Sequence, residues 1–146
     1  MALLDEDPLP PFPGVLELMT SALARDDVRL AIATSSTREK SQAVLESARV
    51  PYREIVYITG SDVTLKKPHP ELFLTAARRL SIAPASCLVI EDAPDGVEAA
   101  HRAGCKCLAV TSSVGAEKLA PAECVVGSLS DVDLETVIGL IRGVSG

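Results

Sequence analysis

Short apolar runs alternate along this chain with segments in which apolar residues recur every three or four positions. Uninterrupted apolar runs are typical of strands buried on both faces, and the three-to-four spacing is typical of helices with one buried face. The predicted strands span residues 28–33, 55–59, 88–90, 107–110 and 125–126, and the predicted helices span 14–23, 36–48, 70–80, 95–103 and 133–142. Strands that alternate with helices form βαβ units, so the sequence predicts an α/β fold with a parallel sheet between two helical layers.

Polar residues and glycine mark the ends of the predicted helices. Asp95 is a good N-cap residue, and Glu98 three positions later completes a capping box. Ser36 and Glu39 repeat this pattern earlier in the chain, and Gly104 supplies a C-terminal stop. Two helices are therefore expected to begin shortly after the carboxyl end of a strand.

Composition narrows both the fold and the function. The 146 residues fit one domain with a sizeable core. Hydrophobic residues make up 47% of the chain but aromatic residues only 3%, so the core must be aliphatic, as in a covered parallel sheet. The net charge of −6 and the lack of a basic tract argue against a nucleic-acid partner.

The sequence gives no sign of a membrane or secretory protein. No apolar run approaches membrane-spanning length, and the acidic residues Asp5, Glu6 and Asp7 close behind Met1 are unlike a signal peptide. The cysteines lack the paired spacing or histidine partners of a zinc site; they are Cys87, Cys105, Cys107 and Cys124. We therefore expect a cytoplasmic protein with free and mostly buried thiols.

Polar groups follow three of the predicted strands. Thr34 ends the first strand, Lys67 follows the loop after the second, and Glu91 and Asp92 directly follow the apolar run at 88–90. Because the carboxyl ends of parallel strands share one edge of a sheet, these side chains are expected to converge. Adjacent carboxylates repel each other unless a cation is near, which favours a Mg²⁺ site over the alternative of an acidic turn.

Three segments carry a resemblance to a known family: Ala-Ile-Ala-Thr34-Ser-Ser, Lys67-Pro-His-Pro-Glu-Leu-Phe and Leu-Val-Ile-Glu91-Asp92-Ala-Pro-Asp-Gly. They resemble the haloacid dehalogenase (HAD) superfamily, in its β-phosphoglucomutase-like and pseudouridine-5′-phosphatase-like branch, from about Pro13 to the C-terminus. The resemblance implies a three-layer Rossmann-like parallel sheet, the HAD core. It also implies that Glu91 and Asp92 bind Mg²⁺ as the cofactor.

The resemblance further implies an activity and the residues that support it. The activity is hydrolysis of a small phosphomonoester, a sugar or nucleotide-type phosphate, through an aspartyl-phosphate. Thr34 corresponds to the phosphate-binding hydroxyl, and Ser35 and Ser36 line the same loop. Lys67 corresponds to the lysine that stabilises the phosphoryl charge. A small phosphorylated metabolite is therefore the implied partner.

The nucleophile of the family has only a weak counterpart in this sequence. The family begins with a central strand that ends in Asp-x-Asp; the first Asp attacks phosphorus and the second transfers protons. In this branch a helical cap separates that motif from the segment matched by Pro13. Here only residues 1–12 precede Pro13, so no cap domain is expected.

Two interpretations of the N-terminus remain open. In one, residues 2–4 are a vestigial strand, Asp5 is the nucleophile and Asp7 is the acid–base group of a capless enzyme. In the other, which the sequence favours, residues 5–13 are the acidic return from an absent cap, and the central first strand is missing. Its absence would leave backbone groups unpaired at about 1–3 kcal/mol each. The chain would then recruit residues 1–4, form a homodimer or need a missing N-terminal segment to complete the sheet.

These interpretations lead to two functions. The first is a HAD-like phosphatase core that is incomplete and weakly active or inactive alone. The second is a non-catalytic HAD-fold fragment that acts as a binding or dimerising module. A receiver domain is excluded, because its acids precede its Thr/Ser and Lys, whereas the order here is Thr34, Lys67, Glu91. We expect residues 1–13 to be an acidic, proline-rich arm and residues 14–146 the core domain.

Overall fold

The computed structural model describes residues 2–4, 14–47 and 55–143. Its strands form one parallel sheet in the order β3-β2-β1-β4-β5-β6. The strands are β1 (Ala2–Leu4), β2 (Leu30–Ala33), β3 (Val56–Ile58), β4 (Leu88–Glu91), β5 (Lys106–Val110) and β6 (Cys124–Val126). The predicted parallel α/β sheet is therefore confirmed.

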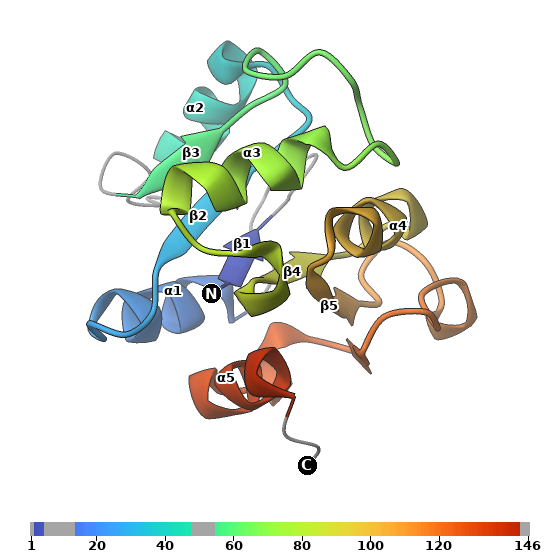
Figure 1. The fold of residues 1–146 in the computed structure, drawn as a ribbon. Helices are drawn as coiled ribbons and strands as arrows, with labels where there is room; N and C mark the ends of the chain where they lie inside the picture. The colour runs from blue at the N-terminus through green and yellow to red at the C-terminus, as the bar shows by residue number, and fades with distance from the viewer. Residues whose placement is uncertain (1, 5–13, 48–54, 144–146) are drawn as a thin grey trace.

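Helices cover both faces of this sheet (Figure 1). They are α1 (Val15–Leu23), α2 (Arg38–Ser47), α3 (Glu71–Leu80), α4 (Pro94–Ala103) and α5 (Leu134–Arg142), with single turns η2 (Pro84–Ser86), η3 (Ala116–Lys118) and η4 (Leu129–Asp131). α3 packs on β2, β3 and α4, while α1 packs on α5 and β2 on the opposite side. The result is the three-layer architecture expected of a Rossmann-like domain.

The first strand lies at the centre of the sheet. Ala2–Leu4 pair with Leu30–Ile32 of β2 on one side and with Leu88–Ile90 of β4 on the other. The strand is only three residues long, which matches the vestigial alternative rather than a missing strand. Since Ala2–Leu4 belong to the sheet, the core begins before the boundary expected at residue 13. Residues 1 and 5–13, the rest of the expected arm, lie outside the described residues.

Two of the predicted helix caps are wrong. α4 begins at Pro94 with Ala93 as its N-cap in extended conformation, so Asp95 lies inside the first turn. Proline suits this first position, because its fixed φ is already helical. α2 begins at Arg38, and the hydroxyl of Thr37 rather than of Ser36 accepts a hydrogen bond from the Lys40 N–H, 3.4 Å away.

Other local predictions are confirmed. Gly104 ends α4 with a φ of 87°, in the left-handed region that favours glycine. The short strand predicted at 125–126 corresponds to β6, which lies at the edge of the sheet. Leu23, the last residue of α1, is 43% exposed.

The core is aliphatic, as the composition predicts. The described residues of β2, β4 and β5 that face it are almost entirely buried, and Phe73 is the largest fully buried side chain. Cys87, Cys105 and Cys107 are buried free thiols and Cys124 is half-buried, so the expected free cysteines are confirmed. Burial raises the pKa of the Cys107 thiol, which keeps it neutral. No helix among the described residues is long and apolar enough to cross a membrane.

Glu123 ties the start of β6 to β5 and makes stability depend on pH. Its Oε1 accepts a hydrogen bond from the Cys107 N–H at 2.7 Å and lies 2.8 Å from His101 Nε2. Partial burial raises the pKa of the Glu123 carboxyl, but these hydrogen bonds outweigh burial and hold the pKa below its usual range. A lowered pKa stabilises the fold above the ordinary carboxyl pKa of about 4.3, and the effect is lost as pH falls through the folded-state value.

We therefore expect Glu123→Gln to lower the midpoint of urea unfolding at pH 6 but not at pH 3. The exposed neighbour Glu117 is the matched control, and Glu117→Gln should leave the midpoint unchanged at both values. An equal loss for Glu123→Gln at pH 6 and pH 3 would show that the charge of Glu123 is not what stabilises this contact.

Candidate active site

The order of the strands reverses beside β1. The chain passes from β1 outward to β2 and β3, and then returns to place β4, β5 and β6 on the other side. In open α/β sheets, ligands bind at the carboxyl ends of the strands where the order reverses. That position lies between the ends of β2 and β4, where Thr34 and Glu91 stand.

Glu91 is the last residue of β4 and is fully buried. Its Oε1 accepts hydrogen bonds from the backbone N–H groups of Asp92 at 3.0 Å and Ala93 at 3.2 Å, and its Oε2 lies 3.4 Å from Lys67 Nζ. Lys67 reaches it from the loop that precedes α3. The expected convergence of Lys67 and Glu91, which are 24 residues apart in the sequence, is therefore seen in the structure.

Gly96 makes room for the buried carboxylate. A Cβ on Gly96 would lie 2.0–2.1 Å from Cγ, Cδ and Oε2 of Glu91, closer than nonbonded atoms approach. Gly96 is in the first turn of α4, so the helix passes directly against the Glu91 side chain. Gly96 is the last residue of the third segment that resembles the HAD family, but only the structure shows that it contacts Glu91.

Asp92 is held by two hydroxyl groups that the sequence analysis missed. Ser113 Oγ donates a hydrogen bond to Asp92 Oδ2 at 2.5 Å, and Ser112 Oγ lies 3.4 Å from the same oxygen. Both serines follow the carboxyl end of β5. The rule that gathered the other strand ends could have identified them, because Thr111-Ser-Ser is a fourth polar segment directly after an apolar run.

Thr34 begins the loop that connects β2 to α2. The residue is buried, its N–H donates to the Ile58 carbonyl at 3.0 Å, and its Oγ1 accepts from the Ser36 N–H at 3.1 Å. Ser35 and Ser36 are half-buried in the same loop. The loop thus lies at the carboxyl end of β2, next to the carboxyl end of β1, and carries three hydroxyl groups.

Arg38 is held by protein contacts although its side chain is 39% exposed. Its Nη2 lies 2.7 Å from Asp62 Oδ2, and its guanidinium lies 5.0 Å from the centre of the Tyr57 ring. Tyr57 belongs to β3, and Asp62 belongs to the loop after it.

The carboxylates at the site suit a hard cation. Mg²⁺ prefers oxygen ligands, and it is often bound through one or two carboxylates together with water and substrate phosphate. Glu91 and Asp92 supply such oxygens, and no group of three or more His, Cys, Asp or Glu side chains gathers around a metal position in the described ranges. The other two predicted site residues, Asp5 and Asp7, lie outside those ranges. The donor set therefore fits Mg²⁺ without specifying a complete coordination shell.

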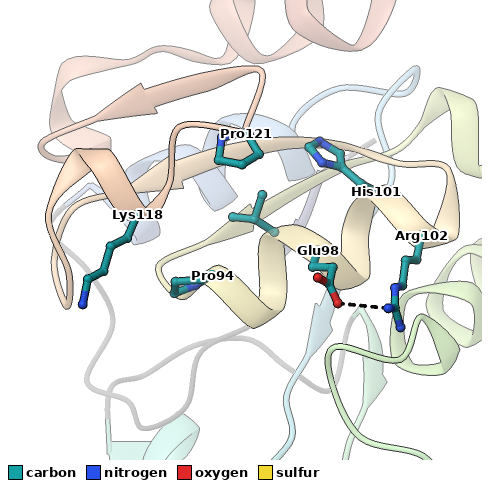
Figure 2. Close-up of a pocket in the computed structure, with 7 residues that line it drawn as sticks. Pro94, Glu98, His101, Arg102, Lys118 and Pro121 are labelled. Carbon is teal, nitrogen blue, oxygen red and sulfur yellow. Dashed lines mark ion pairs between the residues drawn. The ribbon is translucent and has the colours of Figure 1, made fainter.

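A separate hollow runs along the outer face of α4 (Figure 2). Its volume is about 470 Å³, and its lining consists of Pro94, Val97, Glu98, His101, Arg102, Lys118 and Pro121. Arg102 and Glu98 form an ion pair of 3.3 Å at its rim. The lining includes none of the residues at the strand ends, so this hollow is distinct from the candidate active site.

Comparison with known proteins identifies the family. The profile of the haloacid dehalogenase-like hydrolases matches residues 2–110, three quarters of the chain. The chain belongs to this family. The match begins at β1 and includes Thr34, Lys67, Glu91 and Asp92. The HAD resemblance inferred from the sequence is therefore confirmed.

Individual HAD relatives match the chain at moderate identity. It is 36% identical to the validoxylamine A 7'-phosphate phosphatase of Streptomyces hygroscopicus subsp. limoneus over 119 residues, which cover 82% of this chain and 55% of that protein. It is 34% identical to hexitol phosphatase A of Escherichia coli (strain K12) over 120 residues, with coverages of 82% and 55%. Phosphatases of sugar phosphates are thus among its relatives.

Solved structures support the same branch of the HAD family. β-Phosphoglucomutase from Clostridium difficile matches with a TM-score of 0.79 and 25% identity, covering 90% of this chain and 56% of that one. A CbbY variant from Rhodobacter sphaeroides in complex with xylulose-(1,5)bisphosphate matches with a TM-score of 0.75 and 31% identity, covering 82% and 55%. The chain belongs to the CbbY/β-phosphoglucomutase-like branch and spans about half the length of the relatives it matches.

Proposed function

We propose that this HAD domain hydrolyses a small phosphomonoester, of the sugar-phosphate class, in a reaction that depends on Mg²⁺. The observation that carries the proposal is the buried contact of Lys67 with Glu91, next to Asp92, where the strand order reverses. A lysine and two carboxylates at this position suit a phosphate and its counter-cation. The phosphatases among the relatives support the reaction class.

We assign the nucleophile to Asp5, which follows β1 directly in the sequence. A carboxylate oxygen of Asp5 attacks phosphorus and forms an aspartyl-phosphate, while Asp7 donates a proton to the departing alcohol oxygen. Water then cleaves the acyl phosphate and gives its proton to Asp7, which regenerates the enzyme and releases phosphate. The central position of β1 supports this assignment, because its carboxyl end lies between those of β2 and β4.

The remaining site residues bind and neutralise the phosphoryl group. Thr34, Ser35 and Ser36 donate hydrogen bonds to its oxygens, and Lys67 balances its negative charge. Bound at Glu91 and Asp92, Mg²⁺ supplies further positive charge for the phosphoryl oxygens. We expect weak activity from these 146 residues alone, because they span only about half the length of the phosphatases that they match.

The proposal is tested by hydrolysis of p-nitrophenyl phosphate with and without Mg²⁺. We expect slow, Mg²⁺-dependent release of p-nitrophenol that is abolished by Asp5→Asn, because covalent catalysis has no substitute nucleophile. Asp26→Asn is the matched control, since Asp26 is an exposed acid that precedes the amino end of β2, the opposite end of that strand from Thr34, and this variant should retain the wild-type rate.

Two results would contradict the proposal. Equal rates for the wild type and Asp5→Asn would exclude Asp5 as the nucleophile. No turnover by the wild type, combined with Mg²⁺ binding that is lost in Asp92→Asn, would favour the alternative of a non-catalytic HAD-fold module that binds ligands or dimerises.

A further inference from the structure

The loop that begins with Thr34 is joined to the loop that follows β3. The Gly60 N–H donates a hydrogen bond to the Ser36 carbonyl at 2.8 Å. The two backbones approach so closely that a Cβ on Gly60 would lie 2.3 Å from the Ser35 carbonyl oxygen. The position of the phosphate-binding segment therefore depends on the loop formed by residues 59–62.

Asp62 makes several of the contacts that hold that second loop in place. Its Oδ2 accepts hydrogen bonds from the Thr59 N–H at 2.8 Å and from Thr59 Oγ1 at 3.1 Å, and it forms the 2.7 Å ion pair with Arg38 Nη2. Partial burial opposes ionisation of Asp62, but these bonds outweigh it and lower the pKa of the carboxyl. One carboxylate oxygen thus joins the end of β3 to the start of α2.

Arg38 connects the loop of residues 59–62 to the end of the loop that begins with Thr34. It is the first residue of α2, and its N–H lies 3.2 Å from Ser61 Oγ in addition to the ion pair with Asp62. Its guanidinium also lies over the Tyr57 ring. Thr34 is fixed at the other end of the loop by its backbone hydrogen bond to the Ile58 carbonyl. Both ends of residues 34–38 are consequently anchored to β3 and the loop after it.

We propose that Asp62 is a positioning residue for the phosphate-binding loop. By holding Arg38, it keeps the hydroxyl groups of Thr34, Ser35 and Ser36 in the arrangement that receives the phosphoryl group, without touching that group itself. A loop fixed before binding loses less conformational entropy when phosphate arrives, so affinity increases. This inference rests on the proposed function, because it assigns the loop a phosphate ligand.

The test measures binding of inorganic phosphate in the presence of Mg²⁺ by calorimetry and, in parallel, hydrogen exchange of residues 34–38. Asp62→Asn preserves the size of the side chain but removes its charge. We expect it to raise the Kd for phosphate about tenfold, the size of effect typical of one hydrogen bond to a charged group. Exchange of the Ser36 N–H should become faster. Asp26→Asn changes the net charge equally and should alter neither measurement.

A second pair of variants separates positioning from general stability. Arg38→Gln should weaken phosphate binding as much as Asp62→Asn, the double variant should be no weaker than either single one, and Arg38→Lys should recover most of the affinity. Wild-type affinity in both Asp62→Asn and Arg38→Gln would overturn the inference and leave the proposed function intact. If the wild type binds no phosphate although Asp62→Asn loosens the loop, the proposed function fails and the inference fails with it.

Discussion

Replacing Gly96 with alanine is expected to lower the free energy of unfolding by about 3 kcal/mol, a large cost for adding one methyl group. Alanine normally stabilises a helix relative to glycine by about 1 kcal/mol. Here its Cβ would overlap the Glu91 side chain, which is buried and cannot move into solvent. To avoid the overlap, Glu91 must give up its bonds to Lys67 and to the backbone of Asp92 and Ala93.

Urea denaturation of Gly96→Ala, alone and combined with Glu91→Ala, measures this effect. Because Glu91→Ala removes all three overlapping atoms, we expect Gly96→Ala to cost nothing further in that background. Gly127→Ala is the matched control, since a Cβ on Gly127 meets no atom within 4 Å. Equal costs of Gly96→Ala in the two backgrounds would show that the overlap with Glu91 is not the cause.

Replacing Lys67 with alanine is expected to lower stability by about 3 kcal/mol and phosphatase turnover about a hundredfold. The Lys67 and Glu91 side chains are only 13% and 2% exposed, so the carboxylate would stay buried without its lysine partner. Turnover falls for a separate reason, because Lys67 is proposed to balance the phosphoryl charge. Thermal unfolding and hydrolysis of p-nitrophenyl phosphate measure the two effects independently.

The neighbouring lysine provides the control for Lys67. Lys66 is exposed, and Lys66→Ala should leave both stability and turnover unchanged. In the double variant Lys67→Ala with Glu91→Gln, the buried charge is removed as well, so we expect most of the stability to return while turnover stays low. Stability that remains low in this double variant would mean that packing of the lysine stem, rather than charge pairing, is the main contribution.

The regular elements could largely be predicted from the sequence, but their ends could not. Strands such as β4 lie in apolar runs bounded by polar residues, and this pattern survives in the fold because both faces are buried. The start of α4 was displaced because two signals compete there: Asp95 is a good cap, but Pro94 already has the helical φ. The three-residue β1 was ambiguous because so short an apolar segment gives no period.

The part of the candidate site that lies at the strand ends could be predicted from the sequence, but the contacts between loops could not. Placing strand ends along a shared edge brought Lys67 to Glu91, and the same rule extended to β5 would have added Ser113. The ion pair between Arg38 and Asp62 follows from no such rule. It depends on how two loops meet, which is fixed by the close approach of Gly60 and not by any pattern within either segment.

The central position of β1 also constrains how the chain can be assembled during synthesis. Its two neighbours, β2 and β4, begin at Leu30 and Leu88, so the second ladder cannot form until synthesis has passed Ile90. Until then, one edge of β1 has no permanent partner in the chain. β1 is therefore enclosed on both sides only late in synthesis, and contacts so distant in sequence slow the acquisition of the native topology.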